Sequence, residues 1–409
     1  MNQRSVICSA TARFVPREAS TTIPGIFRSH KPRGIQGIEF GNSGPRKYSS
    51  DRFICITSVN HHRFRIRLYK SGEEMKAMVI ARQSSSPGLA LVDVAPAELG
   101  DKQVRVAVRA ASVNRADLAQ LAGTHTSIGG VPQAQVVGLD AAGEIVEVGP
   151  GVTDYARGDR VMAMVAGGLA QEIVVDASML IPIPTNWSYI EGAAAVLGFM
   201  TAHNALVTTA RMADGESVAI HAATSGVGMQ AVQLARYFGA GLIVGTTRSD
   251  RGSALLDALG VDEVINTGST DFAARASEVT QGSGIDIVLD HVGGSYLSMN
   301  IQAAAVKGRI VGVGRLGGAE GLLDMEALAF KRLELVGVTF RTRTTQEKAE
   351  IVHALRRDIA PFRPDAAHRD IHESLRPVIA RVLPWNEAEQ AYQLMSGNDM
   401  LGKIVLEVG

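Results

Sequence analysis

The chain has 409 residues, with 41 basic and 41 acidic side chains and a hydrophobic fraction of 46%. This length accommodates two or three domains of ordinary size and excludes a single small binding module. The absence of net charge excludes a general polyanion binder that acts through its overall charge.

The first 74 residues differ in charge from the rest of the chain. They hold 13 basic and five acidic residues, a net charge of +8 that leaves −8 for the remainder. They show no sustained helix or strand period and contain turn-forming runs at 32–34 and 41–45, so we expect a poorly ordered basic extension over 1–74.

Three readings of this extension stay open. Arginine and serine with few acidic residues are typical of an organellar transit segment, which would direct the protein to mitochondria. Alternatively the start is assigned too early, since residues 75–80 have the pattern of a first strand, and the protein is cytoplasmic. A functional role such as RNA binding is the third reading, although we expect no nucleic acid partner.

Both cysteines, Cys8 and Cys55, lie in the extension. Residues 75–409 therefore offer no disulfide, no thiolate nucleophile and no cysteine-ligated zinc. The longest apolar run, 192–200, is about half of the roughly 18 residues that a membrane helix requires, so we expect no membrane partner.

From residue 75 to 195, short strand patterns are separated by turn clusters. Strands are expected at 76–81, 103–111, 142–148, 160–165 and 171–175. Turn residues such as those at 149–151 and 157–159 punctuate them, which predicts a compact and mostly antiparallel β domain.

Residues 196–334 alternate strand and helix patterns. Strands are expected at 217–222, 242–246, 263–265, 285–290 and 309–313, and helices at 227–238, 253–259 and 272–280. This alternation predicts an α/β domain with βαβ units and a parallel sheet. The tail, 335–409, ends in a further strand pattern at 403–408.

A glycine-rich loop follows the first strand of the α/β region. Ser225, Gly226, Val227 and Gly228, with Ala231, fit the G-x-G-x-x-G/A pattern between an apolar strand and an amphipathic helix. Such glycines permit a tight turn and a close approach of a pyrophosphate to the positive end of the helix. The alternative is that they merely close a strand-to-helix crossover.

The end of the next strand indicates which nicotinamide cofactor is favoured. An NAD-selective fold usually has Asp or Glu there, whereas this chain has Thr247, Arg248, Ser249 and Arg251. Two guanidinium groups and hydroxyls suit a 2′-phosphate, so we expect NADPH. Asp250 argues against this reading, and an ordinary solvated charge run is the alternative.

Several segments together resemble the medium-chain dehydrogenase/reductase superfamily. They are residues 111–118, 138–143, 158–161, 217–231 and 401–405. Over 75–409 the chain is most similar to the zinc-free NADPH:quinone oxidoreductases, the zeta-crystallin-like branch. The resemblance implies a GroES-like catalytic domain in 75–195, a Rossmann domain in 196–334, a return segment in 335–409 that completes the catalytic domain, and a homodimer.

The resemblance also bears on metal. Zinc-dependent alcohol dehydrogenases of this superfamily have Cys where Asn114 stands and a His-Glu pair where Leu139 and Asp140 stand. Without such ligands no Lewis acid is assembled to polarise an alcohol, so we expect no metal. Hydride transfer then requires an acceptor that is already electrophilic, such as a quinone or an α,β-unsaturated carbonyl.

By resemblance, two residues would act on the acceptor. Asn114 would lie beside the nicotinamide and donate a hydrogen bond, or it merely holds a turn. His125 occupies roughly the place of a tyrosine in relatives and could donate a proton near neutral pH, or it is a surface histidine.

Other positions match the family's cofactor contacts. Thr201 would lie near the nicotinamide, Gly293 and Gly314 would line the cleft beyond the strand ends, and Arg341 and Arg343 could reach phosphate. Alternatively, the Thr201 hydroxyl bonds to the backbone of its own helix, the two glycines are ordinary turn residues, and the two arginines lie in a solvated basic loop. His221 and His291 read as structural.

The leading hypothesis is an NADPH-dependent, zinc-independent reductase that transfers hydride to a quinone or other electrophilic acceptor. The first alternative is an enone or enoyl-thioester reductase of the same fold. The second is a non-catalytic, NADPH-binding protein of the crystallin type.

Overall fold

The computed structural model describes residues 52–60, 63–70, 74–82, 87–123, 136–363, 375–397 and 400–409. Most of the expected basic extension therefore lies outside the described residues. Within it, strands β1 (Arg52–Asn60) and β2 (Arg63–Lys70) pair as a two-stranded sheet, regular structure that the sequence pattern did not predict.

The catalytic domain is built on a seven-stranded sheet. Its order is β16-β17-β5-β6-β7-β9, with β8 paired to β5. The strands are β5 (Gln103–Val113), β6 (Asp140–Val148), β7 (Arg160–Met164), β8 (Glu172–Asp176), β9 (Leu180–Pro182), β16 (Ile379–Pro384) and β17 (Lys403–Glu407). All pairs except β16–β17 are antiparallel, as expected for a GroES-like domain.

A smaller sheet and three helices complete this domain. Strands β3 (Met75–Arg82) and β4 (Pro87–Val94) pair antiparallel, and β3 bridges to Ala170 and Val136. Helix α9 (Ala388–Ser396) packs against β17, β16, β5 and β4, helix α1 (Arg115–Leu121) packs against α9, and helix α8 (Thr345–Asp358) packs against β9 and helix α2 (Tyr189–His203). In β5, Val104, Val106 and Val108 are buried in alternation with more exposed residues, the period that made the strand recognisable.

The dinucleotide domain contains a six-stranded parallel sheet of order β12-β11-β10-β13-β14-β15. Its strands are β10 (Ser217–Ile220), β11 (Leu242–Thr247), β12 (Glu263–Asn266), β13 (Ile285–Asp290), β14 (Ala304–Gly312) and β15 (Glu334–Gly337). Its helices are α3 (Gly226–Tyr237), α4 (Ser253–Ala258), α5 (Phe272–Val279), α6 (Leu297–Ala303) and α7 (Met325–Lys331). This is the Rossmann strand order, which confirms the expected fold class and places the switch point between β10 and β13.

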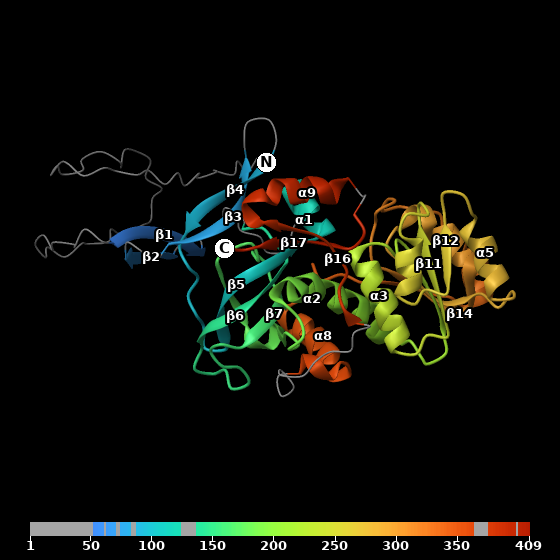
Figure 1. Ribbon diagram of the computed structural model, residues 1–409, viewed down its shortest axis with the longest axis horizontal. Coiled ribbons are helices and arrows are strands. Elements are labelled where there is room, and N and C mark those ends of the chain that lie inside the picture. The colour runs from blue at the N-terminus through green and yellow to red at the C-terminus, as the bar shows by residue number, and fades with distance from the viewer. Residues whose placement is uncertain are drawn as a thin grey trace, which may run out of the picture. The chain divides into compact units, whose positions relative to one another are not determined.

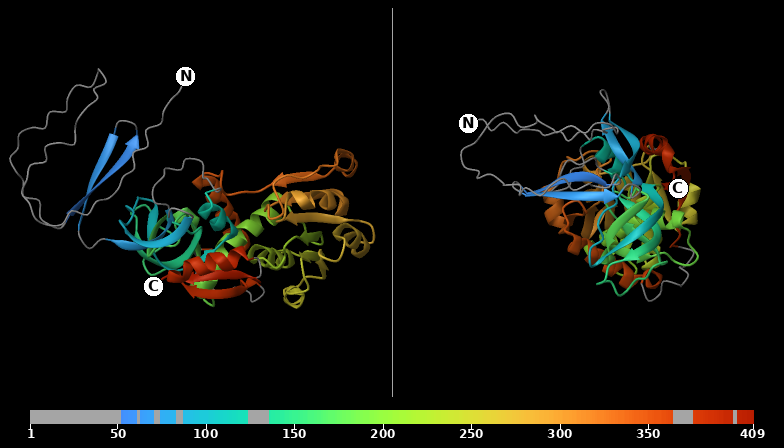
Figure 2. Two further views of the ribbon diagram at one scale, coloured as in Figure 1. Left: turned by 90° about the horizontal axis from the view of Figure 1, so that it is seen from above. Right: turned by 90° about the vertical axis from the view of Figure 1, so that its left-hand side faces the viewer.

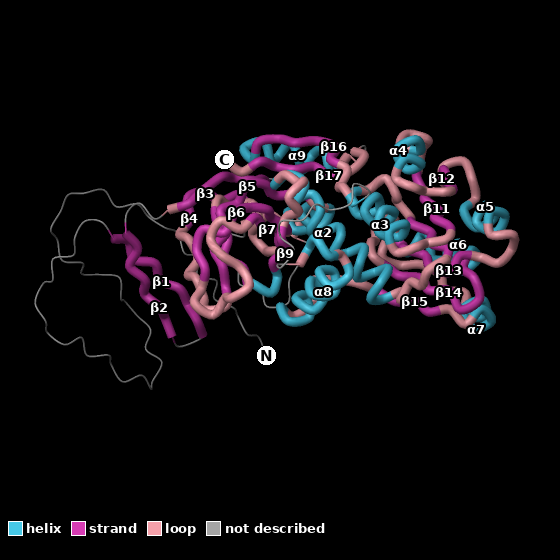
Figure 3. The backbone as a smooth tube through the Cα atoms, turned by 60° about the horizontal axis from the view of Figure 1, so that its bottom comes forward, coloured by secondary structure: helices cyan, strands magenta, loops and turns pink. Residues whose placement is uncertain are grey.

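Helix α2 (Tyr189–His203) joins the two domains. It packs against α3 and against β5, β6 and β7, and α8 lies beside it (Figures 1 and 3). With the π-helical turn that follows, the stretch Tyr189–Thr209 is long and apolar enough to cross a membrane, but 72% of its most apolar window is buried inside the protein. It therefore fits the description of a core helix.

The last strand returns to the first part of the chain. In β17, Ile404 pairs with Val113 and Val405 with Ser112, so the red strands of Figure 2 lie with those that begin the catalytic domain. An aromatic cluster holds the return segment, since Phe362 packs 5.8 Å from Trp187 and 6.0 Å from Phe199 between ring centroids.

Candidate active site

The glycine loop is a strand-to-helix turn, as the sequence predicted. It connects β10 to α3, and Ser225 is the helix N-cap, its hydroxyl accepting a hydrogen bond from the Gly228 N–H at 3.1 Å. Ser225, Gly226 and Val227 are partly exposed. The first N–H groups of a helix have no partner within it, so this turn fits the pyrophosphate of a dinucleotide.

The two glycines of this loop are required for different reasons. A Cβ at Gly228 would lie 2.5 Å from the Ala222 carbonyl oxygen, so the first turn of the helix packs directly on the backbone of the turn that follows β10. A Cβ at Gly226 would lie 2.4 Å from Cδ of Lys403, a residue of the catalytic domain. Gly226 therefore makes room for a neighbouring side chain as well as for the expected ligand.

The catalytic domain contacts this loop through the segment before β17. Ser225 forms a parallel bridge with Gly402, and the Gly402 N–H donates to the Thr224 carbonyl at 3.3 Å. Gly402 has φ of +105° and a Cβ there would lie 2.5 Å from the Val378 carbonyl oxygen, so only glycine fits the close approach. The cofactor loop of one domain is thus backed by a strand of the other.

Asn114 lies in a buried polar cluster at the end of β5. Its amide nitrogen donates to Asp140 Oδ2 at 2.7 Å and to the Ser112 carbonyl at 3.2 Å, and its amide oxygen accepts from Lys403 Nζ at 2.6 Å. Asp140 also accepts from the Ser112 N–H and hydroxyl. Both amide hydrogens thus point to protein acceptors, and donation to a substrate stays a prediction for Asn114.

Burial sets the electrostatics of this cluster. Burial raises the pKa of Asp140, an effect that the Lys403 ammonium opposes, and burial lowers the pKa of Lys403. Asp117, whose carboxylate accepts from the Asn114 N–H at 2.7 Å, has its pKa raised to about 7, chiefly by burial. Two carboxyl groups thus share one buried ammonium.

The end of β11 presents the residues expected to select the cofactor. Arg248, Ser249 and Arg251 are exposed, whereas Thr247 is buried and its hydroxyl donates to the Ser249 carbonyl at 2.9 Å. Asp250 accepts from the Asn266 side chain at 2.8 Å.

One further arginine is close to this end of β11. The pKa of Arg115 is lowered by burial and by the charge of Arg248, so a guanidinium of the catalytic domain lies near one of the dinucleotide domain. Arg115 is not among the site residues that the sequence predicts.

The loops after β13 and β14 come together at the same edge of the sheet. Gly293 has φ of +90°, and a Cβ there would lie 3.2 Å from the Gly314 carbonyl oxygen. Asp290 holds both loops, since its Oδ1 accepts from the Gly293 N–H at 2.8 Å and its carbonyl from the Gly314 N–H at 3.0 Å.

A buried polar network continues from Asp290 to the glycine loop. Asn300 donates to Asp290 at 3.0 Å and lies 2.6 Å from His221 Nε2, while His221 Nδ1 lies 3.0 Å from the Thr246 hydroxyl. Burial lowers the pKa of His221 and of His291 to about 4, so both rings are neutral. The network joins the ends of β10, β11 and β13, in keeping with a structural role for both histidines.

The remaining predicted residues are not drawn into this site by any described contact. The Thr201 hydroxyl donates to the Leu197 carbonyl at 2.7 Å, one turn back in α2. Arg343 donates to the Thr339 carbonyl at 2.9 Å, and Arg341 is exposed. His125 lies outside the described residues. The cofactor roles of Thr201, Arg341 and Arg343 stay predictions.

The donor groups of the described residues do not form a zinc site. Among the described residues, no three His, Cys, Asp or Glu side chains gather in a way that could hold a metal ion. Asp140, at the position where the alcohol dehydrogenases have a zinc ligand, is fully buried and its carboxylate is bonded to Ser112 and Asn114. The expectation of a metal-free mechanism stays a prediction.

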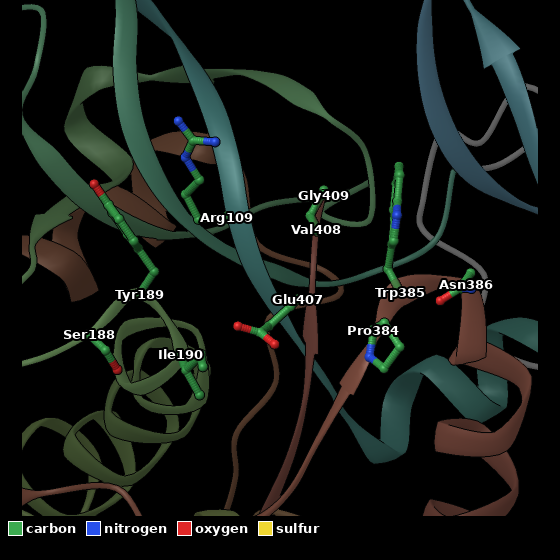
Figure 4. A pocket seen from close by; sticks show the side chains of 10 residues that line it. All are labelled: Arg109, Ser188, Tyr189, Ile190, Pro384, Trp385, Asn386, Glu407, Val408 and Gly409. Carbon is green, nitrogen blue, oxygen red and sulfur yellow. The ribbon is translucent and has the colours of Figure 1, made fainter.

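A cavity of about 660 Å³ lies elsewhere, beside the middle of β5, the ends of β16 and β17 and the start of α2 (Figure 4). Its lining includes Arg109, Tyr189, Trp385 and Glu407 and none of the predicted site residues. It is therefore separate from the candidate active site.

Comparison with known proteins agrees with this architecture. The alcohol dehydrogenase GroES-like domain family matches residues 100–185, and the zinc-binding dehydrogenase family matches residues 226–356. Over 317 residues the chain is 34% identical to the polyketide synthase GfsB of Streptomyces halstedii, a match that covers 77% of this chain and 5% of that synthase. The chain thus spans only a small part of that curated relative.

Two solved structures show the same fold. One is an NAD-dependent alcohol dehydrogenase, with 29% identity and a TM-score of 0.69 over 82% of this chain and 100% of that chain. The other is the apo form of the JamJ enoyl reductase, with 25% identity, a TM-score of 0.69 and the same coverage.

A GroES-like sheet and a Rossmann sheet that meet at a glycine loop define a two-domain oxidoreductase. The chain belongs to the medium-chain dehydrogenase/reductase superfamily, which the two family matches and the similar structures establish.

Sequence reasoning missed the partners of Asn114. Ser112, Asp140 and Lys403 all stand in segments that resemble the family, but no spacing indicates that they meet. The one available signal was a lysine at the start of a mostly apolar final strand pattern, because a buried charge needs a partner.

Proposed function

We propose that this oxidoreductase reduces a carbon–carbon double bond conjugated to a carbonyl group, such as an enoyl thioester, with NADPH as the preferred cofactor. The observation that carries the proposal is the similarity to a polyketide synthase and to an enoyl reductase. It agrees with a site in which Asn114 and Asp140, at the zinc-ligand positions of the alcohol dehydrogenases, are hydrogen-bonded to each other. Only a segment of GfsB is matched, so the rest of that assembly line is no part of the proposal.

The comparisons favour C=C reduction over quinone reduction, which was the leading hypothesis from the sequence. The chain's own residues support either acceptor, because both are electrophilic without a Lewis acid. In C=C reduction a bound NADPH would supply a hydride to the β-carbon and leave as NADP⁺, and a proton would then add at the α-carbon, so that the π bond is replaced by two C–H bonds and the C–C σ bond remains.

The residues of the site would divide this work between the two domains. The N-terminus of α3 would bind the pyrophosphate, and the exposed Arg248 and Arg251 would bind the 2′-phosphate. The end of β5, with Asn114, would face the acceptor. Charge that develops on the carbonyl oxygen after hydride addition needs a placed donor, and Asn114 would supply one by exchanging its bond to Asp140 or to the Ser112 carbonyl for a bond to the acceptor.

The test is NADPH oxidation at 340 nm with three acceptors that differ in the class of electrophile: crotonyl-CoA, an enone and a naphthoquinone. The proposal expects the highest kcat/KM with crotonyl-CoA or the enone. A higher kcat/KM with the quinone would restore the first reading. NADPH binding without oxidation by any of the three would favour a non-catalytic protein of the crystallin type.

We also propose a homodimer formed through the outer edge of the Rossmann sheet. Strand β15 is the last in that sheet, so its outer backbone groups are open to a second strand. Around it, Leu322, Met325, Phe330 and Leu335 are exposed by 87%, 63%, 76% and 45%. A second copy would cover them, and light scattering should give twice the chain mass, whereas Phe330→Asp should give monomers.

A further inference from the structure

Lys403 is a buried lysine that spans the two domains at the candidate active site. It is 4% exposed, it lies at the start of β17, and no carboxylate lies within ion-pair distance of its ammonium among the described contacts. Instead the ammonium donates to the amide oxygen of Asn114 at 2.6 Å. The charges of Asp140 and Asp117 act on this ammonium from a longer distance, so its direct partner is a neutral amide, and a buried ammonium with such a partner calls for an explanation.

The hydrocarbon stem of Lys403 supports the glycine loop. A Cβ at Gly226 would lie 2.4 Å from its Cδ and 2.8 Å from its Cγ, so the stem occupies the space beside this glycine. The adjacent Gly402 pairs with Ser225 in a parallel bridge. The stem therefore fixes how far the loop, and with it the N-terminus of α3, stands from the catalytic domain.

The ammonium fixes the orientation of Asn114. A lysine can only donate hydrogen bonds and a carboxylate can only accept them. Lys403 donates to the Asn114 amide oxygen, and Asp140 accepts from the amide nitrogen. A flip of this amide would break both bonds, and it would place the amide N–H donors against the Lys403 ammonium and the amide oxygen against the Asp140 carboxylate. One side chain thus controls both the loop and the polar end of β5.

We propose that Lys403 is a positioning residue that holds the cofactor loop and the Asn114 amide in a fixed mutual arrangement, so that cofactor and acceptor meet correctly. This inference rests on the proposed reductase function. It assigns the stem to cofactor affinity and the ammonium to turnover, and the two contributions can be separated by substitution.

Three variants separate them. Lys403→Met keeps most of the stem and removes the charge, so Kd for NADPH should stay within threefold of the unaltered protein while kcat falls at least tenfold. Lys403→Ala removes both, so Kd should also rise at least tenfold. Lys403→Arg keeps the charge but is longer and planar, so kcat should fall at least fivefold with little change in Tm.

Lys331→Met is the matched control. The Lys331 ammonium donates to the carbonyls of Ile301, Gln302 and Ala304 within the Rossmann domain, away from Asn114. Its replacement should lower Tm but leave Kd for NADPH and kcat within twofold.

Fluorescence titration of NADPH, steady-state kinetics and thermal unfolding of the full chain decide the outcome. Unchanged kcat in Lys403→Met, or unchanged Kd in Lys403→Ala, overturns the inference. If Lys403→Met does not fold, unchanged kcat in Lys403→Arg does so. If the unaltered protein binds NADPH but reduces none of the acceptors, the proposed function fails. The inference about Lys403 is then tested by Kd for NADPH and by a crystal structure of Lys403→Met. An Asn114 amide that has not moved in that structure overturns the inference.

Discussion

Substitution of Gly228 by alanine tests the glycine loop most directly. The added Cβ would lie 2.5 Å from the Ala222 carbonyl oxygen and 2.8 Å from the Ala223 Cα, both backbone atoms that no rotamer change can move. The first turn of helix α3 must therefore shift away from the turn at Ala222 and Ala223. Overpacking of this kind costs about 1 to 3 kcal/mol, which lowers Tm by roughly 2 to 12 °C in a domain of this size.

The same shift displaces the N-terminus of α3, so Kd for NADPH should rise at least tenfold in a fluorescence titration. Gly337→Ala is the control, since a Cβ at Gly337 meets nothing within 4 Å and the residue lies on β15 of the same sheet. Gly226→Ala should be milder than Gly228→Ala in Tm, because it meets the flexible stem of Lys403. An unchanged Kd in a folded Gly228→Ala protein would refute the dinucleotide assignment.

Four further predictions follow from the site and the sequence. Arg248→Ala should erase most of an NADPH preference of at least tenfold in Kd, because a hydrogen bond to a charged group contributes about 1.5 to 3 kcal/mol; equal affinities for NADPH and NADH in the unaltered protein contradict the assignment. His221 and His291, with pKa values of about 4 below the ordinary 6.5, stabilise the fold above pH 6.5 and lose this contribution as the pH falls toward 4. By pH 5 each should cost about 2 kcal/mol in urea unfolding, and His291→Asn should remove its share of that pH dependence. A chain that starts at Met75 should keep its Tm and turnover and be cytoplasmic, and an insoluble product would show that the extension is needed. Metal analysis should find no stoichiometric zinc, and loss of turnover with EDTA that zinc restores would contradict the metal-free mechanism.

The elements that the sequence predicted well are those with strong local signals. Strand β5 shows alternating burial of Val104, Val106 and Val108, and α3 starts at the Ser225 cap. These depend on residues a few positions apart, so period and capping rules apply. Strand β9 (Leu180–Pro182) and the π-helical turn after α2 lacked such signals, because one is three residues long and the other continues an apolar helix.

The sequence predicts individual residues of the site but not the contacts between them. The sequence predicts that Gly226 makes space for a pyrophosphate, and the structure adds the stem of Lys403 as its neighbour. The sequence predicts that Thr247 contacts the cofactor, which stays a prediction, and the structure adds that its hydroxyl donates to the Ser249 carbonyl. Contacts between segments far apart in the chain, such as Lys403 with Asn114, depend on tertiary packing, which a single sequence does not encode in any local pattern.

The bridge between Ser225 and Gly402 has a consequence for folding. It joins segments that are far apart along the chain, and such contacts form late because the intervening loop must first close. A nascent or proteolytically shortened chain could build the whole parallel sheet and still lack the strand that backs its nucleotide loop. The chain should therefore bind the dinucleotide only after the final strand has docked, so dinucleotide binding indicates that folding is complete.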